Sequence, residues 1–245
     1  MSDEFYIGYE PGMPPSLAAR IRRIARCLIA IALLIPGALV FTQNRFAPGV
    51  FEFGRVQVFR GRIIEFPYPA LMTADAGGVI RVFWLVGRGK HGAADLVRGR
   101  DGQRVEVSGS LISREDDMMI ELEPGTTTVI DEARAHPIEP FRSRGTVTLE
   151  GEIVDSKCHL GVMKPGEGPT HRDCAVRCLL GRIPPMFVPA GRGALGRVSL
   201  VNEVGTPFLN ADAWAGRRVV LRGEILERGV QTFLAVSAHD ARLLD

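Results

Sequence analysis

The most reactive side chains lie in one short segment, DSKCHLGVMKPGEGPTHRDCAVRC, which covers residues 155–178. This segment holds three of the four cysteines and two of the five histidines of the chain, namely Cys158, Cys174, Cys178, His159 and His171. Thiolate and imidazole groups are the usual ligands of zinc, and Cu(I) also favours thiolates. The residue types therefore point to a metal site, a disulfide or a reactive thiol.

The spacing of these residues predicts how they meet. HRDCAVRCLLG is expected to form one short helix, on which His171, Cys174 and Cys178 stand at i, i+3 and i+7 and share a face. Cys158 is expected at the end of the strand GEIVDSKC, from which it reaches that face across the loop GVMKPGEGP. The resulting prediction is a Cys3His metal site that takes zinc or copper.

Two other interpretations of the same cysteines stay open. The spacing C-x12-H-x2-C-x3-C is not that of a standard zinc finger or haem motif, and an exported domain lies in an oxidising compartment where disulfides form. A disulfide would leave one of the three thiols unpaired. The remaining interpretation is a catalytic thiol that neighbouring cations activate.

The polar neighbours are assigned from their local position. His159 is expected on the opposite side of the strand from Cys158, and therefore as an exposed residue instead of a ligand. Asp155 is expected to cap the segment or to accept a hydrogen bond from the ligand histidine. The chain has only three lysines, and all are expected as solvated loop residues: Lys90, Lys157 and Lys164. The alternative role of the last two is to lower a thiol pKa.

No enzyme motif accompanies this segment. Gly191-x-Gly193-x-x-Gly196 matches the letters of a dinucleotide fingerprint, but it precedes the strand RVSLV instead of opening a helix after a strand. A nucleophile elbow, a Walker loop and an H-E-x-x-H pattern are all missing from the sequence. We therefore predict no catalytic and no cofactor-binding residue, and we expect a binding or scaffold protein before an enzyme.

An apolar run near the N-terminus predicts one membrane span. Residues 24–41, IARCLIAIALLIPGALVF, hold no charge after Arg26, and the predicted helix of residues 21–42 has about the 20 residues that cross a bilayer. Arginines precede the run, so the positive-inside rule places residues 1–20 in the cytoplasm as a short arm. The expected location is the inner membrane, with the C-terminal domains in the periplasm. A cleaved signal peptide is the alternative, but the run is longer than a typical h-region and no A-x-A site follows it.

The rest of the chain repeats one pattern of short strands. Two glycine-spaced motifs occur twice, as [FL]-x-G-x-I at 59–63 and 149–153, and as G-x2-V-x3-G at 102–109 and 216–223. The duplication predicts an all-β fold, with two tandem small OB-like barrels after the transmembrane helix, over residues 50–135 and 145–245.

The second copy of the repeat is longer than the first. Gly61 and Gly109 are 48 positions apart, whereas Gly151 and Gly223 are 72 apart, which leaves 24 extra residues in the second copy. This excess corresponds to the Cys/His segment. The insertion is therefore where the second barrel is expected to carry chemistry that the first one lacks.

Three blocks, GEIVDSKCHLGVMKPG, HRDCAVRC and GRIPPMFV, resemble a recurring, largely uncharacterised module of bacterial envelope proteins. Its pattern is G-x-I-x-D-x-x-C, then H-x-x-C-A-x-x-C, then a Pro-containing strand and a G-x-x-V-x-x-x-G hairpin, and the likeness covers about residues 147–240. The resemblance implies an OB-like β domain in which Cys158, His171, Cys174 and Cys178 act together. It implies no particular activity.

Charge and size narrow the choice of partners. The 245 residues leave room for two small domains, and a net charge of +2 without basic blocks gives no pull toward nucleic acid. We expect the membrane and the subunits of a membrane complex, such as a redox complex, as partners of an accessory protein. The alternative is a thiol-disulfide or metal-handling protein, in which Cys174 and Cys178 exchange and Cys158 resolves.

Overall fold

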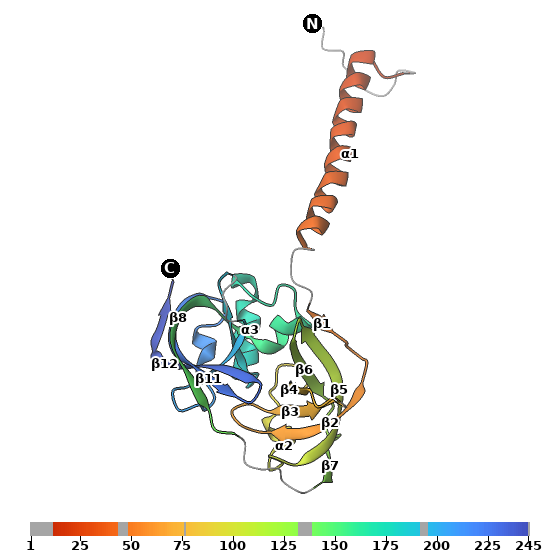
Figure 1. Ribbon diagram of the computed structural model, residues 1–245. Helices are drawn as coiled ribbons and strands as arrows, with labels where there is room; N and C mark the ends of the chain where they lie inside the picture. The colour runs from red at the N-terminus through yellow and green to blue at the C-terminus, as the bar shows by residue number, and fades with distance from the viewer. Residues whose placement is uncertain (1–11, 44–48, 76, 132–138, 192–195, 245) are drawn as a thin grey trace. The chain divides into compact units, whose positions relative to one another are not determined.

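The computed structural model describes residues 12–43, 49–75, 77–131, 139–191 and 196–244 (Figure 1). Residues 1–11 of the predicted cytoplasmic arm lie outside these ranges. Contacts within the chain define two units, Met1–Ala47 and Pro48–Asp245. The first unit contains a long helix, and the second contains the strands.

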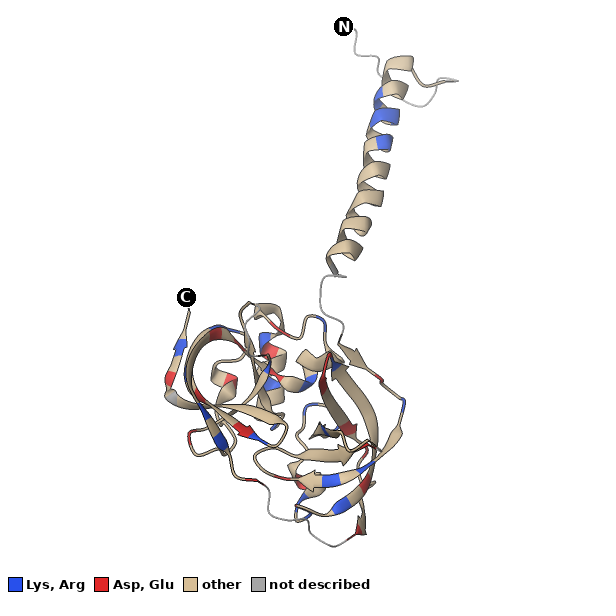
Figure 2. Ribbon diagram, viewed as in Figure 1, with Lys and Arg blue, Asp and Glu red and all other residues tan. Residues whose placement is uncertain are grey.

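The long helix, α1 (Pro15–Gln43), has the properties of the predicted membrane span. Its stretch Pro15–Thr42 has a mean hydropathy of 2.4 and is long and apolar enough to cross a membrane. The helix starts at Pro15, earlier than predicted, because proline fits a first helical turn, where its missing N–H costs no hydrogen bond. Its basic residues lie toward the N-terminal end (Figure 2), at Arg20, Arg22, Arg23 and Arg26.

The first barrel is a closed ring of five strands: β2 (Gln57–Ile64), β3 (Ala70–Ala74), β4 (Ile80–Val86), β5 (Arg104–Arg114) and β6 (Asp117–Leu122). Around the ring the order is β5-β2-β3-β4-β6, and β6 pairs with β5 to close it. Strands β4 and β6 are parallel, and the other neighbours are antiparallel. Two short strands, β1 (Val50–Phe51) and β7 (Thr128–Asp131), also pair with β5, and α2 (Ala94–Val97) connects β4 to β5.

The second barrel is a closed ring of β8 (Arg142–Asp155), β9 (Pro185–Pro189), β10 (Val198–Val201), β11 (Arg218–Arg228) and β12 (Gln231–Leu243). Its order is β11-β8-β9-β10-β12, and β10 is parallel to β12. A 3-10 turn, η3 (Ala211–Ala213), connects β10 to β11. The two rings therefore have the same strand order, and the predicted pair of small OB-like barrels after one apolar helix is confirmed.

The repeated glycines explain why the sequence pattern found this duplication. Gly61 of β2 is paired with Val105, and Gly151 of β8 is paired with Val219, so each motif occupies the same register in its barrel. A Cβ atom on either glycine would collide with a carbonyl oxygen of the next strand. Glycine is required there because the strands approach closely where the small barrel curves.

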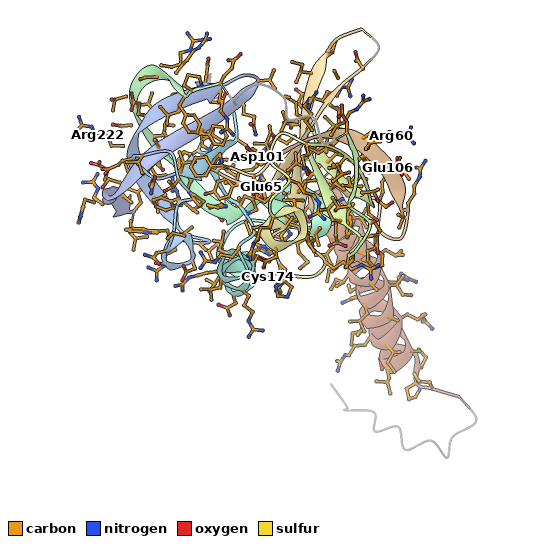
Figure 3. All side chains as sticks on the ribbon, turned by 90° about the horizontal axis from the view of Figure 1, so that it is seen from below. Arg60, Glu65, Asp101, Glu106, Cys174 and Arg222 are labelled. Carbon is orange, nitrogen blue, oxygen red and sulfur yellow. The ribbon has the colours of Figure 1, made fainter. Side chains whose placement is uncertain are left out.

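Charged residues of both signs are spread over both barrels (Figure 2). Some of them form ion pairs between neighbouring strands. In one pair, labelled in Figure 3, Arg60 Nε of β2 donates a hydrogen bond to Glu106 Oε2 of β5 at 2.7 Å. Because both side chains are exposed, solvent screens this ion pair and it contributes little stability.

The extra residues of the second barrel lie between β8 and β9, as their spacing predicts. They form η1 (Cys158–Val162), η2 (Pro169–His171) and α3 (Arg172–Leu180), whereas only a short loop joins the equivalent strands β2 and β3. The predicted helix is therefore present, but β8 ends at Asp155 and a π-helical turn replaces the predicted strand end at Cys158.

The two barrels pack against each other through an apolar core to which both contribute. Trp84 of β4 meets Phe233 of β12 edge-to-face, with ring centroids 6.0 Å apart. The hydroxyl of Tyr68 donates to Leu200 O and accepts from Phe208 N, so a buried side chain of the first barrel pairs backbone groups of the second. Burial of this shared surface holds the inserted segment against the first barrel.

Candidate metal centre

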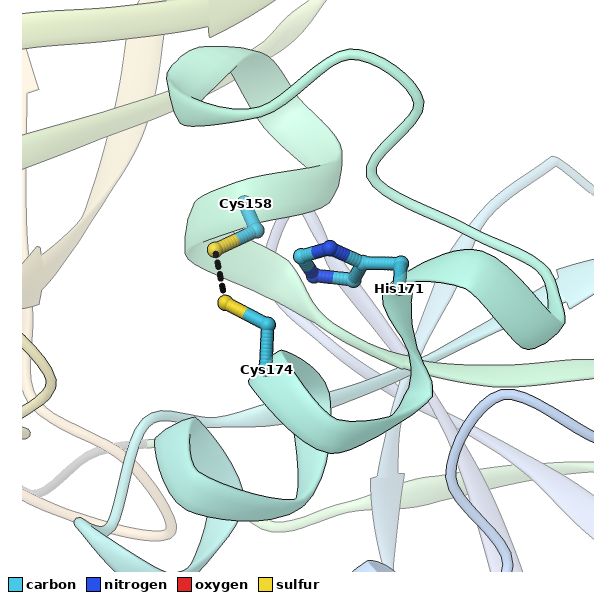
Figure 4. Close-up of side chains that lie close together, drawn as sticks. All are labelled: Cys158, His171 and Cys174. Carbon is cyan, nitrogen blue, oxygen red and sulfur yellow. Dashed lines mark hydrogen bonds between the residues drawn. The ribbon is translucent and has the colours of Figure 1, made fainter.

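The candidate metal centre lies where the insertion folds back against the end of β8 (Figure 4). Cys158 opens the π-helical turn, and His171 ends the 3-10 turn that leads into α3. Cys174 and Cys178 follow on successive turns of α3, so the helical spacing turns both toward Cys158. The three cysteines are free thiols, and Cys158 and Cys178 are buried.

Two of the distances between sulfur atoms match those between metal ligands. Cys158 Sγ lies 3.9 Å from Cys174 Sγ and 3.9 Å from Cys178 Sγ. Tetrahedral zinc with bonds of about 2.3 Å would hold two thiolates about 3.8 Å apart. A disulfide would instead need a sulfur distance of about 2.05 Å. The cluster could hold a metal ion without large movement of these thiols.

The described ligand atoms form two overlapping groups. Those of Cys158, His171 and Cys174 lie within 4.8 Å of one another, and so do those of Asp155, Cys158 and Cys178. Cys158 belongs to both groups, which makes it the central ligand position. Cys158 thus meets each of the other three predicted ligands in one group or the other, Asp155 joins Cys158 and Cys178, and no single group within 4.8 Å contains all four predicted residues.

Asp155 orients Cys158 and His171. It is fully buried, and its Oδ1 accepts a hydrogen bond from Cys158 N at 2.8 Å. Its Oδ2 lies 3.0 Å from His171 Nε2, so Nε2–H donates to the carboxylate and the Nδ1 lone pair is left for a ligand. Asp155 thus performs both of the roles considered for it, as a cap of the insertion and as partner of the histidine.

The first barrel adds a cation to the centre. Lys90, from the loop between β4 and α2, donates from Nζ to Cys174 Sγ at 2.7 Å and to Cys178 Sγ at 3.6 Å. The hydrogen bond to Cys174 raises the pKa of Lys90. Lys90 lies in a partly exposed loop, as predicted, but its contact with the thiols was not foreseen, because it arises only when packing of the barrels brings the loop to them.

Lys157 was also expected in solvent, and this prediction is wrong. Its side chain is buried, donates to Gly87 O at 2.8 Å and to Gly89 O at 2.7 Å, and forms an ion pair with Glu121. Lysine is otherwise rare in this arginine-rich chain, and that rarity is the sequence signal that could have marked both Lys90 and Lys157.

His159 is buried and not exposed as predicted. Arg114 Nη1 donates to His159 O at 2.8 Å, and His159 Nδ1 lies 3.3 Å from Glu167 Oε2. The hydrogen bond from His159 lowers the pKa of Glu167. The prediction failed because the chain leaves the strand at Asp155, so the alternation of strand faces no longer applies at His159. His159 belongs to neither ligand group.

The pKa values of the two buried thiols shift in opposite directions. The hydrogen bond between Cys158 and Cys178, followed by burial and the Asp155 carboxylate, raises the pKa of Cys158. The same hydrogen bond lowers the pKa of Cys178, and the charge of Lys90 acts in the same direction.

The fold and the site define a class: a double OB-like barrel with an N-terminal helix able to span a membrane and a buried thiol and imidazole cluster. Comparison with family models, with curated proteins and with solved structures finds no match at a significant level.

Proposed function

We propose that this protein is a membrane-anchored metal-binding protein, whose Cys3His centre consists of Cys158, His171, Cys174 and Cys178. The observation that carries the proposal is the pair of 3.9 Å distances from Cys158 Sγ to the other two sulfurs. Side chains of two separate elements converge at a buried place, and thiolates together with imidazole are the ligands that hold structural zinc.

Zinc is the ion that the surroundings favour. Zinc prefers four ligands in a tetrahedron, and a histidine that donates its other ring N–H to a carboxylate is a common zinc ligand. The hydrogen bond from His171 to Asp155 supplies this arrangement. Cu(I) is the second candidate, because three thiolates alone satisfy it.

The cellular role that we propose is that of a scaffold or accessory subunit of a membrane complex, with a redox complex as the expected setting. The apolar helix α1 supports a single-pass anchor, and the arginines at its N-terminal end support barrels on the periplasmic side of the inner membrane. The shared core of the two barrels supports a rigid platform for partner subunits.

Metal analysis of the full chain tests the proposal. The protein is purified anaerobically in mild detergent, and its metal content is measured by inductively coupled plasma mass spectrometry. We expect about one zinc or copper ion per chain. The Cys27→Ser variant is the matched control, because Cys27 lies in α1, and it should keep the metal. A metal-free protein with a disulfide between Cys158 and either helix cysteine would overturn the proposal.

One observation favours a second function, thiol-disulfide exchange. Lys90 lies 2.7 Å from the partly buried Cys174, and a nearby cation favours the thiolate that attacks a disulfide. In that reaction Cys174 bonds to one sulfur of a substrate disulfide and releases the other as a thiol, and Cys158 then displaces the substrate. A Cys158→Ser variant should trap the mixed disulfide on Cys174. If no adduct accumulates with a disulfide-containing substrate, exchange is excluded.

A further inference from the structure

The loop that carries Lys90 is fixed against the insertion by backbone contacts. Gly92 N donates to Gly181 O at 2.8 Å, just beyond the end of α3. A Cβ on Gly181 would overlap Lys90 O, and a Cβ on Gly92 would overlap Arg182 O. Glycine at both positions therefore allows the first barrel to approach the site helix at van der Waals distance.

A second set of contacts holds the same loop from the other side. Lys157 lies one residue before Cys158, and its Nζ donates to the carbonyl oxygens of Gly87 and Gly89. The ion pair with Glu121 of β6 neutralises this buried lysine. The position of Lys90 thus depends on residues from the first barrel and from the insertion.

Lys90 itself points at sulfur. Among the residues that the structure describes, the hydrogen-bond partners of its Nζ are Cys174 and Cys178. A lysine fixed beside thiols instead of acids is suited to a site that is itself negatively charged.

The charge of the proposed centre supplies this negative partner. Three thiolates carry three negative charges and a neutral imidazole none, so a divalent ion leaves one negative charge on these ligands, and the buried Asp155 carboxylate adds a second beside them. A single ammonium group at hydrogen-bond distance from one thiolate offsets one of these charges in a partly desolvated place.

We propose that Lys90 is the charge-compensating residue of the metal centre, so that the first barrel completes a site whose ligands all belong to the second. This inference rests on the proposed metal function. It assigns a purpose to the duplication: one barrel carries the ligands and the other provides their counter-charge.

Zinc affinity tests this role. Full-length protein in detergent, reduced and freed of metal, is titrated with zinc, and in parallel with Cu(I), against a chromophoric chelator. Lys90→Met removes the charge and should weaken zinc binding by about tenfold or more, whereas Lys90→Arg should restore most of the affinity. Lys164→Met removes an exposed lysine of the same insertion and should bind zinc as the unmodified protein does.

The outcomes separate the two proposals. If the unmodified protein binds neither zinc nor Cu(I) in the titration, both proposals fail. If it binds zinc and Lys90→Met binds equally well, the metal function stands and the role of Lys90 is wrong. Far-ultraviolet circular dichroism of each variant identifies a loss of affinity that comes from unfolding, and Lys90→Arg decides between lost charge and lost packing.

A proximity probe tests the contact without any affinity measurement. o-Phthalaldehyde joins an amine and an adjacent thiol into a fluorescent isoindole, and Lys90 and Cys174 are adjacent. The metal-free protein should become fluorescent, and zinc added beforehand should protect it. Lys90→Met should remove the signal and Lys164→Met should keep it. A Lys90→Met protein that stays fluorescent would contradict the proposed contact.

Discussion

His171 Nε2 lies 3.0 Å from Asp155 Oδ2, and both side chains are buried. The pair fixes which ring nitrogen carries the proton, and therefore which nitrogen can bind a metal ion. The other oxygen of the same carboxylate holds the backbone of Cys158, so one residue aligns two of the proposed ligands.

Asp155→Asn should impair metal binding while the fold persists. The asparagine oxygen can still accept the hydrogen bond of Cys158 N, but its NH2 group then faces His171 and favours the proton on Nδ1. We expect a loss of zinc affinity of about 10- to 100-fold, measured by competition with a chelator. Unchanged affinity would show that His171 is not a ligand.

Cys158→Ser should lower metal retention at least as much as Cys174→Ser or Cys178→Ser. Cys158 belongs to both groups of ligand atoms, whereas each helix cysteine belongs to one. The check is the metal content of each variant after dialysis. A Cys158→Ser protein that retains more metal than the helix variants would place the ion nearer to α3 than the sulfur distances indicate.

The buried hydroxyl of Tyr68 should make the protein sensitive to alkali. Burial raises the pKa of Tyr68 in the folded protein, so folding is stabilised below its unfolded pKa of about 10 and loses this contribution as the pH rises above that value. Tyr68→Phe should lower the free energy of unfolding by about 1–3 kcal/mol at pH 7, because Leu200 O and Phe208 N lose their hydrogen-bond partner.

Urea unfolding of both proteins between pH 7 and pH 11 tests this prediction. The unfolding free energy of the unmodified protein should fall more steeply above pH 10 than that of Tyr68→Phe. Parallel curves would assign the alkaline loss to another group.

Lys157→Met should destabilise the double barrel by about 3 kcal/mol, because it leaves the largely buried Glu121 carboxylate without its partner. The measurement is urea unfolding at pH 7. Adding Glu121→Gln to this variant should recover part of the loss. A double variant that is less stable than Lys157→Met alone would show that the carbonyl contacts of Lys157 dominate.

A reporter fused after Asp245 tests the proposed topology. Alkaline phosphatase, which needs an oxidising compartment for its disulfides, should be active in the fusion, and a cytoplasmic fluorescent reporter at the same position should be inactive. Replacing the arginines before the span with neutral residues should weaken this orientation. Cytoplasmic reporter activity in the unmodified fusion would reverse the topology.

The sequence predicted the features that depend on local periodicity. The repeated glycines at Gly61 and Gly151 are required by close strand approach, so their spacing revealed two equivalent barrels. The face shared by Cys174 and Cys178 followed from the helical repeat.

The features that the sequence missed depend on contacts across long stretches of chain. Lys90 is 84 residues from Cys174, and Lys157 is 70 residues from Gly87, so neither contact leaves a local pattern. The error at His159 has a different cause. The sequence keeps the strand pattern beyond Asp155, but the strand ends there because the buried Asp155 side chain caps the turn that follows.

The separation of Lys90 and Cys174 along the chain also determines at which stage of folding the metal centre can form. The loop around Lys90 is synthesised well before α3, and their contact requires both rings to be closed and packed together. Contacts between such distant residues form late, because the loop entropy must be overcome first. Full affinity for metal would therefore be acquired in the last step of folding. The appearance of metal binding during refolding would report that both barrels have closed and packed together.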